Sequence, residues 1–216
     1  MDHNFWHDRW EKNEIPFHES EVNSLLVNNF NKLPIKENNR IFIPLCGKTL
    51  DIGWLLSKGQ SVAGAELSEF AVTELFKQLD VAPTIKETGS LKHYSAPNID
   101  IYVGNIFDLT QEILGHVDAI YDRGAYVALP KTIRINYSQH LMHITKNASQ
   151  LLIAYEYNQS LMKGPPFSIP LNELENNYQE TYEISNLVCQ DVDRGLKGKC
   201  TAIENVWILK ERKLLE

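Results

Sequence analysis

The residue types best suited to chemistry surround a turn that follows a short apolar run at residues 41–43. Gly47 lies in that turn, and Glu66 ends the next short apolar run along the chain. This spacing indicates a β-α-β unit whose parallel strands bring their carboxyl ends to one edge of a sheet. A carboxylate at that edge has the acceptor oxygens to hold both hydroxyls of a ribose. We predict this role for Glu66; the alternative is a solvated charge at a strand end.

The turn lacks the features of the common phosphate-binding loops. Gly47-Lys48-Thr49 matches the end of a P-loop, but Phe42 stands where that motif needs its first glycine. A dinucleotide fingerprint needs several glycines, and this turn has a single one. The turn therefore disfavours a nucleoside triphosphatase and favours a nucleoside ligand without a pyrophosphate. S-adenosylmethionine, in which adenosine joins an amino acid through a sulfonium, is such a ligand.

Two further strand ends carry side chains that would meet at the same edge of the sheet. Asn105 and Ile106 follow the third predicted strand, where Asn105 would bond an adenine edge and Ile106 would pack on its face. For Asn105, an ordinary strand-end turn is the alternative. Arg123 follows the fourth predicted strand, and its guanidinium would bind the cofactor carboxylate or orient an anionic acceptor. A surface ion pair between Arg123 and Asp122 is the alternative.

Aromatic residues gather near the N-terminus. Trp6 and Trp10 are one turn apart on a predicted short helix, a spacing that is typical of packing against a core. The functional interpretation is that a tryptophan closes over the cofactor, and the two interpretations are compatible. A second helix is predicted over residues 18–30, so the segment before the sheet would form a helical lid.

Several of these motifs together resemble the thiopurine S-methyltransferase family of class I S-adenosylmethionine-dependent methyltransferases. The matching segments are Pro44-Leu45-Cys46-Gly47-Lys48 with Trp54 and Glu66 after it, Trp6-His7-Asp8-Arg9-Trp10, Phe17-His18, Asp122-Arg123-Gly124-Ala125 and Gly164-Pro165-Pro166-Phe167. The resemblance extends from Trp6 to the last predicted strand. It implies transfer of a methyl group from S-adenosylmethionine to the sulfur of an aromatic or heterocyclic thiol, and in bacterial members also to selenium and tellurium compounds.

The resemblance also implies roles for individual residues. Trp10, Leu45 and Arg123 would join Glu66, Asn105 and Ile106 in the cofactor site, and Phe17 and Arg194 would contact the acceptor. No residue is assigned as a catalytic base, although Arg123 would orient a thiolate. No metal ligands are predicted, because His140 and His143 have no carboxylate or cysteine near them in sequence. A sensor that binds the nucleoside without turnover is the alternative function.

Strand and helix patterns alternate along the chain and end in a hairpin, which predicts a doubly wound α/β fold. With the resemblance, this becomes a Rossmann-like class I methyltransferase fold: a mostly parallel seven-stranded sheet with a C-terminal antiparallel hairpin. We predict one domain over residues 1–216, with a helical lid at 1–38 and the core at 39–216. Residues 81–97 are mixed in character and predict a loop with a short extension.

The composition of the chain limits the kinds of partner and substrate that we expect. The chain has 216 residues and a net charge of −7, which disfavours a nucleic-acid partner and suits a small-molecule substrate. Three cysteines without a C-x-x-C pair argue against a disulfide framework. The N-terminus lacks the pattern of a secretory signal, and no apolar run is long enough to span a bilayer. We therefore expect a cytoplasmic monomer that acts on a small-molecule thiol.

Overall fold

The computed structural model describes residues 3–212, so the ends of the predicted domain, residues 1–2 and 213–216, lie outside the described residues. The strands are β1 (Arg40–Pro44), β2 (Ser61–Glu66), β3 (Thr84–Thr88), β4 (Leu91–Ala96), β5 (Ile99–Val103), β6 (Ala119–Arg123), β7 (Ser149–Tyr157), β8 (Tyr182–Asp191) and β9 (Ala202–Glu211). The α-helices are α1 (His3–Glu11), α2 (Ser24–Asn29), α3 (Asp51–Ser57), α4 (Glu69–Gln78), α5 (Gln111–Leu114), α6 (Lys131–Thr145) and α7 (Leu171–Tyr178).

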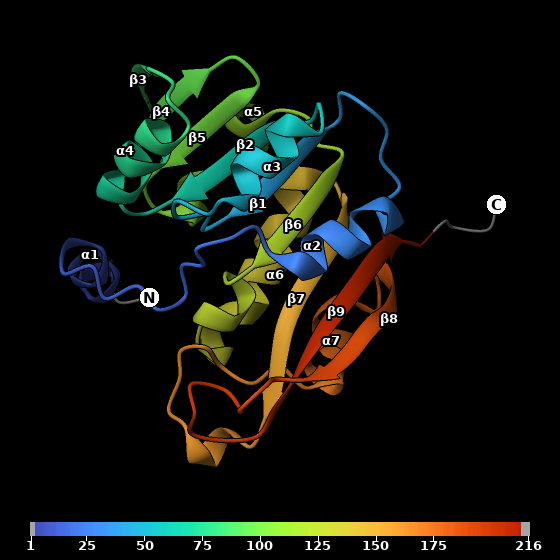
Figure 1. Cartoon of the computed structure of the whole chain (residues 1–216). Coiled ribbons are helices and arrows are strands. Elements are labelled where there is room, and N and C mark those ends of the chain that lie inside the picture. Colours follow the sequence, from blue (N-terminus) through green and yellow to red (C-terminus); the bar gives the residue numbers. More distant parts are fainter. Residues whose placement is uncertain (1–2, 213–216) are drawn as a thin grey trace.

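The strands form one sheet in the order β3-β4-β5-β2-β1-β6-β7-β9-β8 (Figure 1). The five central strands, β5, β2, β1, β6 and β7, are parallel, and antiparallel pairs flank them on both edges. Strand order reverses on either side of β1, so the carboxyl ends of β1, β2 and β6 surround the crevice where such sheets bind ligands. The predicted doubly wound fold and its C-terminal antiparallel hairpin are confirmed.

Helices cover both faces of the sheet, because alternate side chains of each central strand point to opposite faces. Along β1, Ile41 and Ile43 pack in a cluster with α2, α3 and α4, whereas Phe42 packs in the cluster with α5, α6 and α7. Leu151 and Leu152 of β7 divide between the same two clusters. The parallel strands are therefore buried on both sides, which explains their nearly continuous apolar sequence.

The sheet has two more strands than the seven predicted. Residues predicted to form a loop at 81–97 form the hairpin of β3 and β4, which pair antiparallel and extend the sheet beyond β5. β3 is an edge strand that is exposed along most of its length, so it has no buried face to produce an alternating pattern. Gly89 adopts φ +63° in the tight turn between the two strands.

The predicted helix over 18–30 is shorter in the structure and begins at Ser24. Asn23 ends the preceding extended segment, and its side-chain oxygen accepts hydrogen bonds from the backbone N–H groups of Leu25 and Leu26. Asparagine at this position is a strong N-cap, which explains where the helix starts. In the described part of the chain, no helix has the length and apolar character needed to cross a membrane.

Candidate active site

The turn after β1 forms the floor of the candidate site. It adopts left-handed backbone conformations, with φ +46° at Leu45 and +53° at Gly47, and the N–H of Cys46 bonds to the carbonyl of Ala65 at 2.9 Å. A Cβ atom on Gly47 would lie 2.8 Å from the indole of Trp10. Glycine is therefore needed here for two reasons, its conformation and the close approach of the N-terminal helix.

Glu66 is at the end of β2 and is only 5% exposed. One carboxylate oxygen accepts the N–H of Gly47 at 2.8 Å, and the other accepts the N–H of Ser68 at 2.8 Å. Burial raises the pKa of Glu66, and these backbone hydrogen bonds partly oppose that shift. The alternative of a solvated strand-end charge is wrong, because the carboxylate is buried and bonded. Each oxygen retains a second lone pair, so the group still fits a ribose diol.

Trp10 lies over the turn from the helix α1, which Figure 1 shows beyond the carboxyl ends of β1 and β2. Its side chain is buried, and its ring meets that of Phe17 edge-to-face at 5.5 Å between centroids. Trp6 contacts the same Phe17 ring at 5.8 Å. Trp10 is therefore packed on the turn after β1, as predicted for a helix anchored to the core, and stands where it would cover a ligand. The ring contacts of Trp6 are to aromatic residues of the N-terminal segment itself.

A cavity of about 400 Å³ opens at Leu67 and Ser68, the residues that follow Glu66 along the chain. Its walls come from α1, the segment after β2, the β3–β4 hairpin and the end of β5, and it is lined by His7, Glu11, Leu67, Ser68, Glu69, Phe70, Glu87, Ser90, Lys92 and Val103. A cavity of this size next to a ribose-competent carboxylate fits an adenosine moiety. The hairpin that the sequence prediction missed thus supplies part of the wall.

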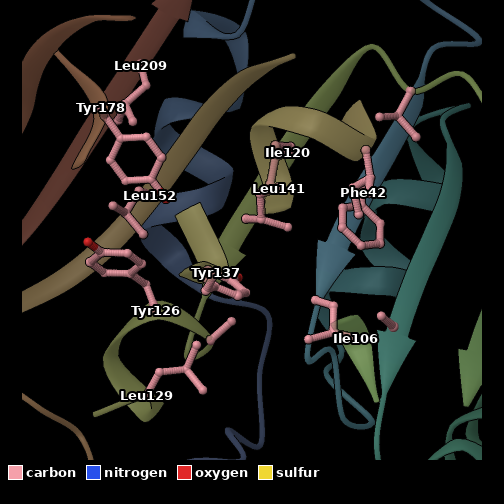
Figure 2. Close-up of a cluster of buried hydrophobic side chains, with 14 of the residues drawn as sticks. Phe42, Ile106, Ile120, Tyr126, Leu129, Tyr137, Leu141, Leu152, Tyr178 and Leu209 are labelled. Carbon is pink, nitrogen blue, oxygen red and sulfur yellow. The ribbon is translucent and has the colours of Figure 1, made fainter. Parts of the chain in front are cut away.

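Asn105 and Ile106 follow β5, as predicted, but they make contacts within the protein. The Asn105 side chain accepts the N–H of Phe107 at 3.3 Å, the contact expected for the strand-end turn that we gave as the alternative. Ile106 is 2% exposed, and Figure 2 draws it in the same buried cluster as Phe42. A contact of either residue with adenine stays a prediction, and for Ile106 it would need the turn to open.

Arg123 ends β6 and reaches toward the N-terminal segment. Its Nη1 donates to the carbonyl of Phe17 at 2.9 Å, and its Nη2 forms an ion pair with Glu19. The suggested ion pair between Arg123 and Asp122 is wrong, since Asp122 points into the core. There it accepts bonds from the N–H of Tyr126 at 3.0 Å and the hydroxyl of Tyr137 at 2.7 Å.

In the β8–β9 connection, Arg194 lies elsewhere than predicted, and Lys197 makes a contact that was not predicted. The side chain of Arg194 is 92% exposed, and its ion-pair partner is the equally exposed Asp193 at 3.7 Å. The structure therefore does not bring Arg194 to the other candidate residues. Lys197 of the same connection donates to the carbonyl of Pro165 at 2.8 Å. Only the fold places Lys197 against the Gly164–Phe167 motif, because residues 165 and 197 are distant in sequence.

Metal-ligating side chains do not gather in this region. Across residues 3–212, no group of three or more His, Cys, Asp or Glu residues is arranged to hold a metal ion. His140 instead bonds the carbonyl of Ile106 at 2.8 Å and contacts the ring of Phe107. The expectation of metal-independent activity stays a prediction.

Several solved structures with a similar fold are S-adenosylmethionine-dependent methyltransferases. One from Anabaena variabilis superposes with a TM-score of 0.65 over 97% of this chain and 95% of its own, at 15% identity. A methyltransferase from Burkholderia thailandensis, crystallised with S-adenosylhomocysteine, gives a TM-score of 0.63 over 97% and 87% of the chains, at 11% identity. At such identities the likeness shows the fold alone: the Rossmann-like fold of class I methyltransferases.

The sequence narrows this class to one family. The family model described as thiopurine S-methyltransferase matches residues 1–213. The thiopurine S-methyltransferase of Xanthobacter autotrophicus is 48% identical over 211 residues, which cover 97% of this chain and 99% of that relative. The chain belongs to the thiopurine S-methyltransferase family. The predicted family, enzyme class and cofactor, S-adenosylmethionine, are confirmed.

Proposed function

We propose that this methyltransferase acts on the sulfur of an aromatic or heterocyclic thiol. The observation that carries this proposal is the Phe17 ring, which is 38% exposed although Trp10, its neighbour, is buried. An exposed aromatic residue at the end of the sheet where the cofactor belongs suits a flat acceptor, and the Phe17 backbone is fixed there by a hydrogen bond from Arg123. The family name printed for its relatives supports the same substrate class.

The roles of the residues follow from their positions. S-adenosylmethionine supplies an electrophilic methyl group when bound. Glu66 would hold the ribose, Leu45 and Gly47 would shape the floor, and Trp10 would cover the cofactor. Phe17 would stack on the acceptor so that sulfur and methyl carbon lie in line, about 3–3.5 Å apart. Because a thiolate is already a strong nucleophile, orientation is the main task left to the protein.

A turnover assay with labelled S-adenosylmethionine and a panel of aryl thiols tests this proposal. We expect methylated thiol to form, and Phe17→Ala to raise the KM for aryl thiols. Ile135→Ala is the control, since Ile135 is an exposed apolar residue on α6 that does not line the cavity beside α1. Tight binding of S-adenosylhomocysteine without turnover of any thiol would instead identify a sensor.

The remaining expectations depend on further measurements. Methylation of selenium and tellurium compounds, which the family resemblance implies, can be tested with a selenol in the same assay. The single-domain organisation, the monomeric state, the cytoplasmic location and the absence of a nucleic-acid partner stay predictions.

A further inference from the structure

Residues 17–23 are the second part of the connection between α1 and α2, and they are attached to the sheet separately from α1. Figure 1 shows this segment passing the carboxyl end of β6 on its way to α2. The backbone carbonyl of Phe17 accepts a hydrogen bond from Arg123, and the side chain of Glu19 pairs with the same guanidinium. We call residues 17–23 the strap. Its attachment uses the backbone of Phe17. The Phe17 ring contacts Trp6 and Trp10, but the residue is 38% exposed, so part of the ring can face a ligand.

A continuous chain of hydrogen bonds supports Glu19 from the other side. The second oxygen of Glu19 accepts from the Asn23 side chain at 3.2 Å, and the backbone N–H of Asn23 donates to buried Asp51 at 2.8 Å. Asp51 in turn accepts the hydroxyl of Tyr121 at 2.9 Å. Tyr121 and Arg123 both belong to β6 and share one face of it, because they are two residues apart. The chain of bonds therefore begins and ends on the same strand.

We propose that Glu19 is a positioning residue for the acceptor: it fixes the guanidinium of Arg123 and, through it, the backbone that carries the Phe17 ring. The part of this proposal that concerns the acceptor rests on the proposed function. Glu19 touches neither reacting atom and acts through its neighbours. Its carboxylate is anchored by Asn23 to the N-terminus of α2, so it presents a rigid partner to Arg123.

The geometry leaves Arg123 free to do more than hold the strap. A guanidinium has five N–H donors, and the bonds to Phe17 and Glu19 use two of them. The Glu19 side chain is 42% exposed and that of Arg123 is 16% exposed, so the pair is partly screened by solvent. Glu19 also balances the charge of Arg123, so the pair adds no net charge to the site. Its contribution is to orient the backbone of Phe17.

Hydrogen exchange and kinetics of Glu19→Gln test the proposal, with Glu19→Asp as the conservative variant. Glu21→Gln is the matched control, because Glu21 is an exposed glutamate two residues along the strap. In cofactor-free Glu19→Gln we expect faster exchange at residues 17–23. We also expect the KM for an aryl thiol to rise about five- to tenfold, as for loss of a partly exposed charge-assisted hydrogen bond.

The kinetic pattern separates positioning from a general loss of structure. In Glu19→Gln, kcat at saturating aryl thiol and the KM for an aliphatic thiol should be unchanged, since an acceptor without a ring does not use Phe17. Glu19→Asp should recover part of the KM, because it keeps the charge. Unchanged strap exchange, or equal effects on aryl and aliphatic thiols, would overturn the proposal. If the unmutated protein methylates no thiol, the proposed function fails, and the exchange result alone decides whether Glu19 holds the strap.

Discussion

At the scale of single residues, Glu66 has two tasks that compete for the same oxygens. Its carboxylate ties the turn at Gly47 to the segment at Ser68, and we propose that it also receives the ribose. Buried donors left without partners are costly, so any substitution here disturbs the apo protein as well as the ligand. Stability and affinity must therefore be measured separately.

Glu66→Ala should weaken binding of S-adenosylhomocysteine by about tenfold or more, because hydrogen bonds to a charged group contribute roughly 1.5–3 kcal/mol. Calorimetric titration well below the unfolding temperature gives the affinity, and thermal unfolding without ligand gives the stability. We expect both to fall. A lower Tm with unchanged affinity would limit Glu66 to holding the turn.

Asp122 makes the stability of the protein depend on pH. Burial raises its pKa from 3.8 to about 6, and the bonds from Tyr126 and Tyr137 only partly offset that shift. Between about pH 4 and pH 6 the folded protein therefore binds a proton that the unfolded chain has lost, so this group lowers stability as pH rises. The penalty is absent below the unfolded pKa and complete above the folded one.

Asp122→Asn should remove this penalty while keeping both hydrogen bonds, since an amide can accept from Tyr126 and donate to Tyr137. Relative to the unmutated protein, the variant should gain up to about 3 kcal/mol in free energy of unfolding between pH 4 and pH 7. Urea unfolding across this range measures the difference. Asp80→Asn is the control for loss of a carboxylate charge, because Asp80 is exposed. If Asp122→Asn changed the free energy of unfolding by the same amount at every pH, the argument would be contradicted.

At the scale of elements, α1 and the strap differ in how they are held. The strap is bonded to the guanidinium of Arg123 on β6. In contrast, α1 is held by apolar contacts: Trp10 packs on the turn, Trp6 and Trp10 contact Phe17, and the helix packs against α4. We expect a ligand in the cavity beside α1 to complete contacts of the second kind. In that case α1, more than the whole N-terminal segment, is the element predicted to close.

Residues 3–16 should exchange amide hydrogens rapidly in the free protein and become protected when S-adenosylhomocysteine binds. Hydrogen-exchange mass spectrometry with and without this ligand measures the change. Protection that is equal in both states would argue against a lid.

Trp10→Ala should weaken cofactor binding about tenfold while changing Tm little, because its indole covers the ligand site from a helix at the edge of the fold. Trp54→Ala is the control, since Trp54 packs edge-to-face against Phe30 away from the turn. That variant should lower Tm and leave cofactor affinity unchanged. The reverse pattern would make Trp10 a packing residue alone.

At the scale of the whole molecule, activity should depend on the ionisation of the acceptor. Heterocyclic thiols are more acidic than cysteine, whose free pKa is about 8.5, so much of such an acceptor is thiolate near neutral pH. For two acceptors of well-separated pKa, the pH profiles of kcat/KM should rise at different pH values, each following its own thiolate. Activity should also survive a chelator. Profiles that rise together would identify an enzyme base in control.

The class of fold could be predicted from the sequence, and so could the strand ends that carry the candidate cofactor residues. Buried parallel strands are apolar along their whole length, so they are easy to recognise in the sequence. Gly47, Glu66 and Arg123 follow or end such strands, and parallel strands joined by β-α-β crossovers bring their carboxyl ends to one edge of the sheet. These features are local, so they are visible in the chain before it folds.

Only the tertiary structure decided which of these residues meet, and which are buried. β3 was missed because an edge strand without a buried face lacks alternation. Ile106 was predicted at the site from its place after a strand, and only the structure shows that it is buried in the core. Glu19 lies far from Arg123 in sequence, and nothing in its neighbours indicates its partner. The spacing of residues along a strand or helix determines which residues share a face of that element. Contacts between segments that are distant in sequence depend instead on how the helices pack on the sheet, and this packing is determined by the chain as a whole.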